Sequence, residues 1–238
     1  MKNKLYGALL GDIVGSIYEF NPIPYYEFPL NIHDEKGYIT DDSLLTIAMA
    51  DSIINNKCTV DCLKEWSKEY NIPGNKLGFG LRYLDWIYSD FTNDSWSNGA
   101  LMRVSPFMWT NNLIGAINST KGSHEHYKSV ISITELYKLY NNSRVFKNHP
   151  INNFDSLDES CEGTIKFVKF VWEKYVNFST QELILETIRY NGDCDTNASI
   201  LGELSNYHNN DLKKIDIDYV NSKLDNKQLS IIEKFNKL

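Results

Sequence analysis

The sequence predicts an all-α protein of 238 residues. Apolar residues recur every three or four positions through most of the chain, whereas the strict apolar–polar alternation of a half-buried strand is almost absent. An apolar content of 42% suffices for one good core in a single domain, or for two small ones. We find no internal repeat and no linker rich in Pro, Gly or Ser, and therefore treat residues 1–238 as one domain.

The helical spacing places the predicted elements along the chain. The first helix carries Leu5, Ala8 and Leu9 at helical intervals. The second is rich in Leu, Ile and Ala on all sides, which predicts a buried helix. Later segments keep the same spacing, as Val168 and Val171 illustrate. The predicted helices span residues 5–19, 42–56, 59–70, 77–90, 127–141, 161–176, 180–190 and 196–207.

Two other segments complete the predicted organisation of the chain. Residues 208–238 form a C-terminal tail, in which 218–236 predicts one or two amphipathic helices. Residues 142–160, with Pro150 inside them, are the best loop in the sequence. The fold expected from these elements is a helical domain with one long central loop.

Composition and charge narrow the functional classes. The net charge of −7 argues against a nucleic-acid backbone as the main partner, because phosphate binding needs a basic surface. No apolar run approaches the ~20 residues that span a bilayer. The N-terminus is basic, and Asp12 interrupts the apolar stretch that follows it, so we do not expect a signal peptide. These features predict a cytoplasmic protein without a membrane partner.

The cysteines do not form a recognisable metal or disulfide pattern. Cys58 and Cys62 lie four residues apart on a predicted helix, which would supply half of a zinc site. No second pair and no neighbouring histidine completes that site, so zinc is not expected. Cys161 and Cys194 are isolated in sequence, and all four thiols are expected to be reduced.

Two short acidic runs about 150 residues apart carry the functional signal: Thr-Asp-Asp-Ser at 40–43 and Asp-Cys-Asp-Thr at 193–196. Like charges at this density repel one another unless a cation lies between them. An apolar helix follows each run, and helix capping explains only one Asp or Thr of each. Carboxylates at such loop-to-helix junctions can converge on a hard cation, so we expect magnesium, manganese or calcium.

An EF-hand does not explain the second acidic run. Asp193, Asp195 and Asn197 match the first three ligand positions of such a loop. However, Ala198 stands where the turn requires glycine, and Leu204 occupies the position of the closing acid. The run therefore has to be interpreted together with its counterpart at 40–43.

The first predicted helix contains Gly7, Gly11 and Gly15 at four-residue intervals, although each glycine costs a helix about 1 kcal/mol relative to alanine. Close helix–helix contact and the approach of a ligand or metal are both possible explanations. Asp12 and Glu19 lie two turns apart on one face, with Gly15 between them, which resembles a floor for a polar ligand. The competing interpretation is that Glu19 only ends the helix. A negative charge at the C-terminal end of a helix is, however, unfavourable with respect to the helix dipole.

Two segments between the acidic runs are weaker signals. The Ser-Asn-Gly sequence at 97–99 predicts a turn with small side chains and accessible N–H groups. Such a turn can bind phosphate or sugar hydroxyls, but an ordinary turn has the same composition. His124 and His126 precede a predicted helix and are either a surface turn or ligand contacts.

Several of these segments together resemble the ADP-ribosylglycohydrolase family, over about residues 5–207. The matching motifs, in the order of that family, are residues 11–20, 40–43, 97–106, 123–124 and 192–196. Residues 160–164 (Ser-Cys-Glu-Gly-Thr) also resemble the bacterial-type branch, similar to dinitrogenase-reductase-activating glycohydrolase. The resemblance implies an orthogonal helical bundle with a centre of two divalent cations, Mg²⁺ or Mn²⁺.

The resemblance also implies roles for individual residues. The metal ligands would be Thr40, Asp41, Asp42, Asp193, Asp195 and Thr196. Glu19 and Asp42 would be catalytic. The ADP-ribose pocket would be lined by Asn98, Gly99, Met102 and His124. The chain departs from the family pattern at Cys194 and Asn197, in a shorter 142–160 region, and beyond about Tyr207, where the customary C-terminal stretch is not recognisable.

The predicted function is metal-dependent hydrolysis of an N- or O-glycosidic bond to ADP-ribose. The acceptor would be a modified protein or a small ADP-ribosyl compound, and a nucleic acid only if it is itself ADP-ribosylated. Glu19 would activate the water or protonate the leaving group. A catalytically inactive ADP-ribose-binding or structural protein on the same scaffold is the alternative, and a hydrolase of another nucleotide-sugar is a third possibility.

Overall fold

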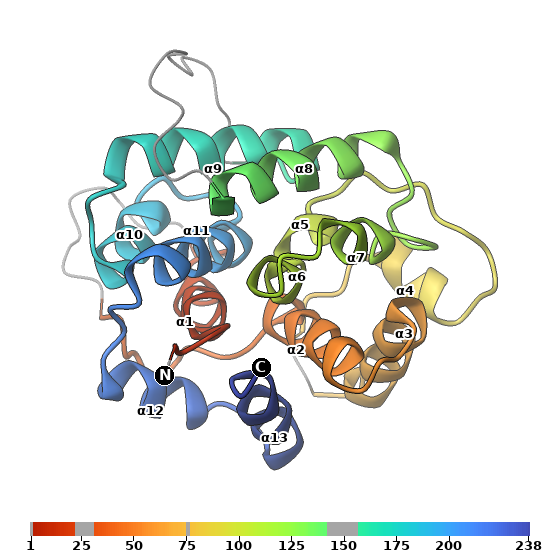
Figure 1. The fold of residues 1–238 in the computed structure, drawn as a ribbon, viewed down its shortest axis with the longest axis horizontal. Coiled ribbons are helices and arrows are strands. Elements are labelled where there is room, and N and C mark those ends of the chain that lie inside the picture. The colour runs from red at the N-terminus through yellow and green to blue at the C-terminus, as the bar shows by residue number, and fades with distance from the viewer. Residues whose placement is uncertain (1, 22–30, 75–76, 142–156) are drawn as a thin grey trace.

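The computed structural model describes residues 2–21, 31–74, 77–141 and 157–238, which form thirteen helices and no named strand. The predicted all-α fold is confirmed (Figure 1). The helices are α1 (Tyr6–Gly15), α2 (Asp41–Ile54), α3 (Thr59–Tyr70), α4 (Leu81–Ile87), α5 (Gly99–Met102), α6 (Ser105–Trp109), α7 (Leu113–Asn118), α8 (Tyr127–Asn141), α9 (Cys161–Tyr175), α10 (Thr180–Ile188), α11 (Cys194–Asn209), α12 (Lys214–Asn221) and α13 (Asn226–Phe235).

Most predicted helices are present, with shifted ends. The helix expected at 5–19 ends at Gly15 and continues as turns, and the tail expected at 218–236 forms two helices, α12 and α13. The short helices α5, α6 and α7 were not predicted, because four to six residues are too few to show a helical period. Of the loop predicted at 142–160, residues 142–156 lie outside the described residues, and 157–160 are not helical.

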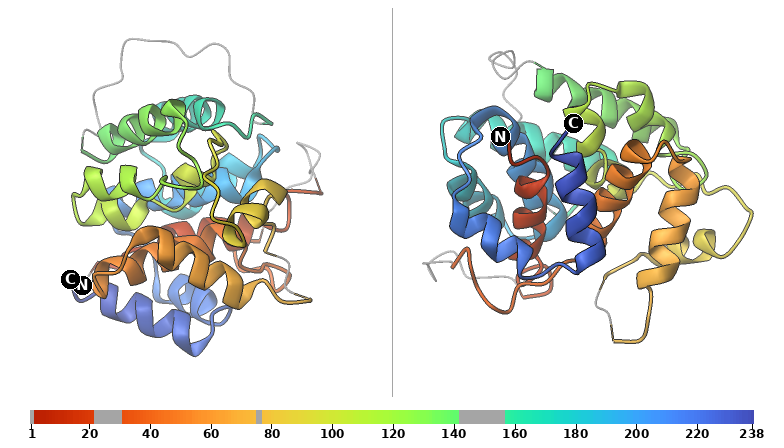
Figure 2. Two further views of the ribbon diagram at one scale, coloured as in Figure 1. Left: turned by 90° about the vertical axis from the view of Figure 1, so that its right-hand side faces the viewer. Right: turned by 60° about the horizontal axis from the view of Figure 1, so that its bottom comes forward.

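The helices are stacked in layers (Figure 2). Helices α8 and α9 lie at one end, α12 and α13 lie at the opposite end, and α1 and α2 lie between them. The two ends of the described chain are neighbours, since Lys4 N donates to Asn236 Oδ1 at 2.7 Å. In the described part of the chain, no helix combines the length and the apolar character that a bilayer span requires.

The central contact of the bundle is the antiparallel pair of α1 and α11, which share the most extensive packing of any two helices. A methyl group added to Gly11 would lie 2.0 Å from Ala198 O, and one added to Gly15 would lie 2.5 Å from Asp195 Cα. The glycine stripe therefore allows the two backbones to touch. Of the two explanations for the stripe, the structure shows the helix–helix contact, which also brings Asp195 close to α1.

A buried carboxylate fixes the other end of this helix pair. Glu203 of α11 accepts hydrogen bonds from Leu5 N at 2.8 Å and Ala8 N at 2.7 Å, and from the Trp109 indole. These backbone groups are at the start of α1, where N–H groups have no partner within the helix. Glu203 thus sets the position of α1 along α11, and α6 joins the same contact through Trp109.

The C-terminal tail holds the segment that leads into α2. Tyr219 of α12 donates to Asp34 O at 2.6 Å, and Lys223 donates to Glu35 O at 2.7 Å. Nε2 of His33 lies 2.7 Å from Oδ1 of Asp216, whose side chain is buried. Helix α13 packs against α2 and α12 packs against α1. The tail therefore supports the backbone that precedes the first acidic run.

Replacing Gly11 by Ala tests the α1–α11 contact. The added methyl group meets a backbone carbonyl, which cannot rotate away as a side chain can, so we expect a loss of about 3 kcal/mol of unfolding free energy, the upper end of the usual cost of overpacking. Gly80→Ala is the control, because Gly80 has open space around it; the protein should lose no more than about 1 kcal/mol, since Gly80 is the N-cap of α4 and glycine is preferred to alanine there. Urea unfolding that gives equal values for the two variants contradicts the contact.

Replacing Glu203 by Gln tests the buried carboxylate. Burial raises the pKa of Glu203 from 4.5 to about 7, so in that interval the folded state keeps a proton that the unfolded chain releases. The stability of the wild type relative to E203Q is therefore greatest below pH 4.5, and it falls by up to about 3 kcal/mol as the pH rises through 7. Urea unfolding from pH 4.5 to 8 measures this difference in stability. A difference that stays constant or increases with pH would contradict the prediction.

Candidate metal centre

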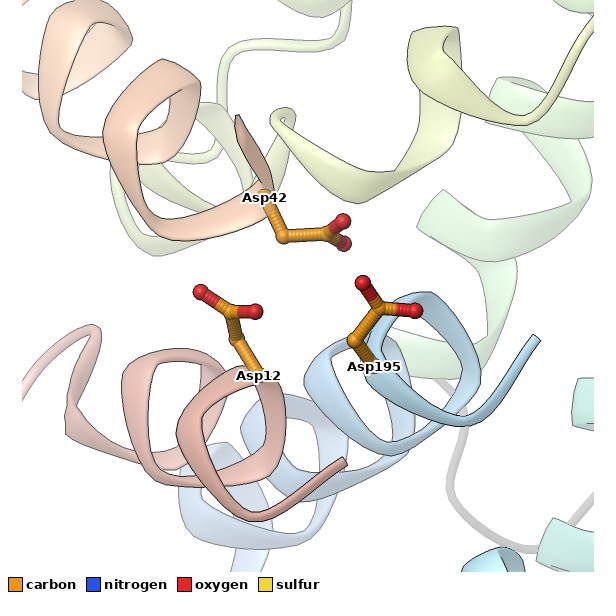
Figure 3. Close-up of side chains that lie close together, drawn as sticks. All are labelled: Asp12, Asp42 and Asp195. Carbon is orange, nitrogen blue, oxygen red and sulfur yellow. The ribbon is translucent and has the colours of Figure 1, made fainter. Parts of the chain in front are cut away.

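Three carboxylates from three helices converge in the interior (Figure 3). Asp12 lies on α1, Asp42 in the first turn of α2, and Asp195 in the first turn of α11. All three are buried, and one oxygen atom from each lies within 4.8 Å of the others. The two acidic runs that are distant in sequence therefore meet in space, together with an aspartate that belongs to neither.

Asp12 joins α1 to the start of α2. Its Oδ2 accepts hydrogen bonds from Thr40 N at 3.0 Å and Ser43 N at 3.1 Å, and its Oδ1 accepts one from Thr40 Oγ1 at 2.7 Å. Burial raises the pKa of Asp12 to about 6, and these hydrogen bonds oppose the rise. The sequence suggested a polar floor at Asp12, and the structure shows a carboxylate that also caps α2.

Asp42 is the least satisfied member of the group. Its Oδ2 accepts from Thr196 Oγ1 at 3.2 Å, while its Oδ1 is buried and has no hydrogen-bond partner among the described residues. Burial, followed by the charges of Asp12 and Asp41, raises the pKa of Asp42 well above its usual range. An unpaired buried carboxylate oxygen is costly, and a cation or a proton would offset this cost.

The remaining acids of the two runs surround this group. Burial, followed by the charges of Asp42 and Asp193, raises the pKa of Asp195 well above its usual range. The pKa of Asp41 is also raised, by burial and then by Asp12, and its backbone N–H donates to Leu77 O at 2.7 Å. Asp41 and Asp193 are only partly buried and lie beside the three converging carboxylates rather than among them.

Glu19 approaches the centre from the turns that follow α1. Its backbone N–H donates to Gly15 O at 3.2 Å, and its side chain is only partly buried. Burial raises the pKa of Glu19 to about 7, and the charges of Asp193 and Glu159 add to the rise, while a hydrogen bond with Asp195 opposes it. Glu19 is thus a carboxyl group with a raised pKa at the edge of the cluster.

The residues predicted to line a ligand pocket fall into two groups. The buried Asn98 donates its side-chain amide to Asp193, and Gly99, which is partly buried, follows it at the start of α5. The side chains of Met102 and His124 are buried in the protein. The structure therefore brings Asn98 to the acids, whereas Met102 and His124 support the surrounding framework.

Two residues beside the acids had no assigned metal or catalytic role in the sequence analysis. Asp12 stood inside a recognised motif, and its position on the glycine-rich face was a usable signal. Glu159 gave no signal because it lies at the end of the predicted loop. Its carbonyl accepts from Asn98 N at 2.8 Å, which brings its charge near Glu19.

The donor set fits a hard divalent cation. It consists of carboxylate and hydroxyl oxygens, with Asp42 Oδ1 buried and unpaired, and it contains repelling charges that only protonation or a cation can relieve. Oxygen ligands of this kind suit Mg²⁺, Mn²⁺ or Ca²⁺ better than a soft metal.

The family model for ADP-ribosylglycohydrolase matches residues 2–132, more than half of the chain. The chain belongs to the ADP-ribosylglycohydrolase family. The match includes Asp12, Asp42 and Asn98 but ends before the second acidic run, so the place of Asp195 in the site rests on the geometry alone. Membership of this chain in the bacterial-type branch of the family stays a prediction.

A solved structure described as "ADP-ribosylglycohydrolase-related protein complex" has the same fold. It is 14% identical in sequence, its TM-score is 0.73, and the match covers 99% of this chain and 96% of that one. The likeness extends over the helices beyond residue 132 and supports the predicted fold type for the whole chain. No curated protein matches the sequence.

Asp42→Asn tests the cation site without any assay of activity. We expect 1 mM Mg²⁺ or Mn²⁺ to raise the melting temperature of the wild type, because a ligand that binds only the folded state stabilises it, by about 2.7 kcal/mol at 100 times its Kd. D42N should lose this response and, without metal, should melt above the wild type because one repelling buried charge is gone.

The matched control is Asp85→Asn, which changes an exposed aspartate on α4. D85N should respond to the cations as the wild type does. Equal stabilisation of D42N and the wild type, or no stabilisation of the wild type, would show that the acid cluster holds no cation.

Proposed function

We propose that this protein is a metal-dependent glycosidase that hydrolyses the bond between ADP-ribose and its acceptor. The acceptor is an ADP-ribosylated protein or a small ADP-ribosyl compound. The observation that carries this proposal is the buried group of Asp12, Asp42 and Asp195, with one carboxylate oxygen unpaired, in a chain of the ADP-ribosylglycohydrolase family.

The two acidic runs and their hydroxyl groups supply the proposed ligands of two divalent cations, Mg²⁺ or Mn²⁺. The proposed ligands are Thr40, Asp41, Asp42, Asp193, Asp195 and Thr196, and we add Asp12 to this set because its carboxylate converges with those of Asp42 and Asp195. When bound, such cations orient the ribose hydroxyls and lower the pKa of a water molecule. The hydrogen bonds from Thr40 to Asp12 and from Thr196 to Asp42 orient these carboxylates.

Glu19 is the proposed acid–base residue. With a pKa of about 7, its carboxyl group can hold a proton for the leaving group or accept one from water at neutral pH. Cleavage of a glycosidic bond passes through an oxocarbenium-like state, which nearby carboxylates stabilise. Asp42 is the second catalytic candidate, because it belongs to the cluster and its buried Oδ1 has no hydrogen-bond partner among the described residues.

The segments around α5 form the proposed substrate-binding wall. Asn98 donates its side-chain amide to Asp193, and Gly99 packs against the imidazole of His124, where an added methyl group would lie 3.0 Å from Nε2. Met102 and His124, also proposed for this wall, have buried side chains and would shape the pocket from behind. Thr46 Oγ1 donates to Met102 O at 3.2 Å, which fixes the end of α5 to α2.

Glu19→Gln separates chemistry from binding. The amide cannot exchange a proton, so kcat should fall by about 10²- to 10⁴-fold while ADP-ribose binding remains. The assay measures ADP-ribose released from a panel of arginine-, serine- and asparagine-linked substrates with Mg²⁺, Mn²⁺ or chelator.

The matched control for this assay is Glu65→Gln, which changes an exposed glutamate on α3 and should leave kcat unchanged. If E19Q turns over like the wild type, Glu19 is not the acid–base residue. If the wild type binds ADP-ribose but cleaves none of the substrates, the protein is a binding module.

A further inference from the structure

A cavity of about 770 Å³ lies beside the candidate metal centre. Its wall comes from three parts of the chain: the segment 37–39 that leads into α2, the end of α3 with the residues that follow it, and the junction of α12 and α13. Ligand-binding pockets have volumes of about 300–1,000 Å³, so the cavity is large enough for a ligand. The three converging aspartates are not part of the described wall, which makes the cavity a separate site.

The cavity and the metal centre share a wall. Ile39 lines the cavity and stands two residues before Asp41, so the Cα atoms of these residues lie within about 8 Å of each other. Leu77, which also lines the cavity, accepts a hydrogen bond from Asp41 N at 2.7 Å. A methyl group added to the next residue, Gly78, would lie 3.4 Å from Asp41 Oδ1. Since an extended chain advances about 3.3 Å per residue, two or three residues cover the distance from Asp41 to the cavity.

The charged side chains of the wall already have partners within the protein. Glu69 forms an ion pair with Lys227. Asp225 accepts a hydrogen bond from the Tyr70 hydroxyl at 2.5 Å, and Lys223 donates to a backbone carbonyl at 2.7 Å. A small ionic ligand would have to compete with these contacts, so charge does not select the occupant of the cavity.

The unpaired polar groups of the wall are amides. In the described part of the chain, neither the N–H nor the carbonyl of Ile39 has a hydrogen-bond partner. The side chain of Gln228 lines the cavity and has a buried Nε2 without a partner, while its Oε1 accepts from Asp225 N at 2.9 Å. An N–H and a carbonyl left unpaired beside a groove match the backbone of a second extended chain, as at the edge of a sheet.

Apolar side chains complete the wall. The Tyr70 ring stacks on Trp66, with 5.5 Å between the ring centroids. Ile72 follows at the end of α3 and is 54% exposed, whereas Leu77 is buried at the base of the same wall. Covering the exposed part of Ile72 with an apolar side chain is favourable. The cavity therefore combines backbone partners with apolar surface, which suits a peptide better than a phosphate or a sugar.

We propose that this cavity binds the polypeptide of the ADP-ribosylated acceptor. An extended segment next to the modified residue pairs with the backbone of Ile39 and places an apolar side chain against Ile72. This proposal rests on the proposed function and narrows its acceptor to a protein, because a small ADP-ribosyl compound leaves the cavity empty.

Two substrates with the same linkage test this proposal: an ADP-ribosylated peptide and the free ADP-ribosylated amino acid, with arginine, serine or asparagine as the modified residue. The wild type should have the higher kcat/KM for the peptide. Ile72→Ser should raise KM for the peptide about five- to tenfold, because part of an apolar side chain is no longer covered, and should leave the amino acid unaffected. Ile72→Val keeps most of the apolar surface and should behave as the wild type does.

The matched control is Ile114→Ser, which changes an exposed isoleucine on α7, outside the cavity wall. I114S should cleave both substrates as the wild type does. Hydrogen exchange supplies a readout that needs no turnover: the unmodified peptide should slow exchange of the Ile39 amide in the wild type, and less so in I72S.

The outcomes separate this proposal from the proposed function. If the wild type cleaves the peptide no better than the amino acid, or if I72S affects both substrates equally, the cavity is not the acceptor site although the proposed function stands. If no substrate is cleaved, the proposed function fails. Unchanged exchange of the Ile39 amide in the presence of the peptide overturns the acceptor site in either case.

Discussion

The repulsion among buried carboxylates is the constraint on which this structure depends. Two unit charges 4 Å apart repel by about 4 kcal/mol at the effective dielectric constant near a protein surface, and Asp12, Asp42 and Asp195 lie at about this separation. The contact between α1 and α11 holds two of them in place, because the glycine stripe lets the backbones touch and leaves little room for the helices to slide apart. Hydrogen bonds from the start of α2 to Asp12 fix the third.

The polar groups around the cluster stabilise different parts of the structure. Glu203 fixes the far end of the α1–α11 pair by binding the free N–H groups of α1, so the two helices are held at both ends. The turn at 97–99 contacts Asp193 through Asn98, and it contacts His124, which lies beside the buried Arg103. Contacts to an acid of the cluster and to a buried histidine therefore both restrain this turn.

The sequence predicted the fold class and the long helices because burial imposes a visible period on them. It also predicted that Asp42 and Asp195 act together, since isolated helix caps do not need paired acids. It did not reveal that Asp12 caps α2, because that contact joins residues 28 positions apart and depends on how α1 crosses the start of α2. The short helices α5 to α7 owe their form to tertiary contacts, not to periodicity.

The central claim is that the meeting point of α1, α2 and α11 is a cation site. Diffraction data collected at the manganese absorption edge, from crystals grown with Mn²⁺, test it most directly. The account predicts anomalous density between Asp42 and Asp195, within coordination distance of Asp42 Oδ1. A well-ordered cluster without anomalous density, or manganese bound only at other acids of the surface, would contradict it.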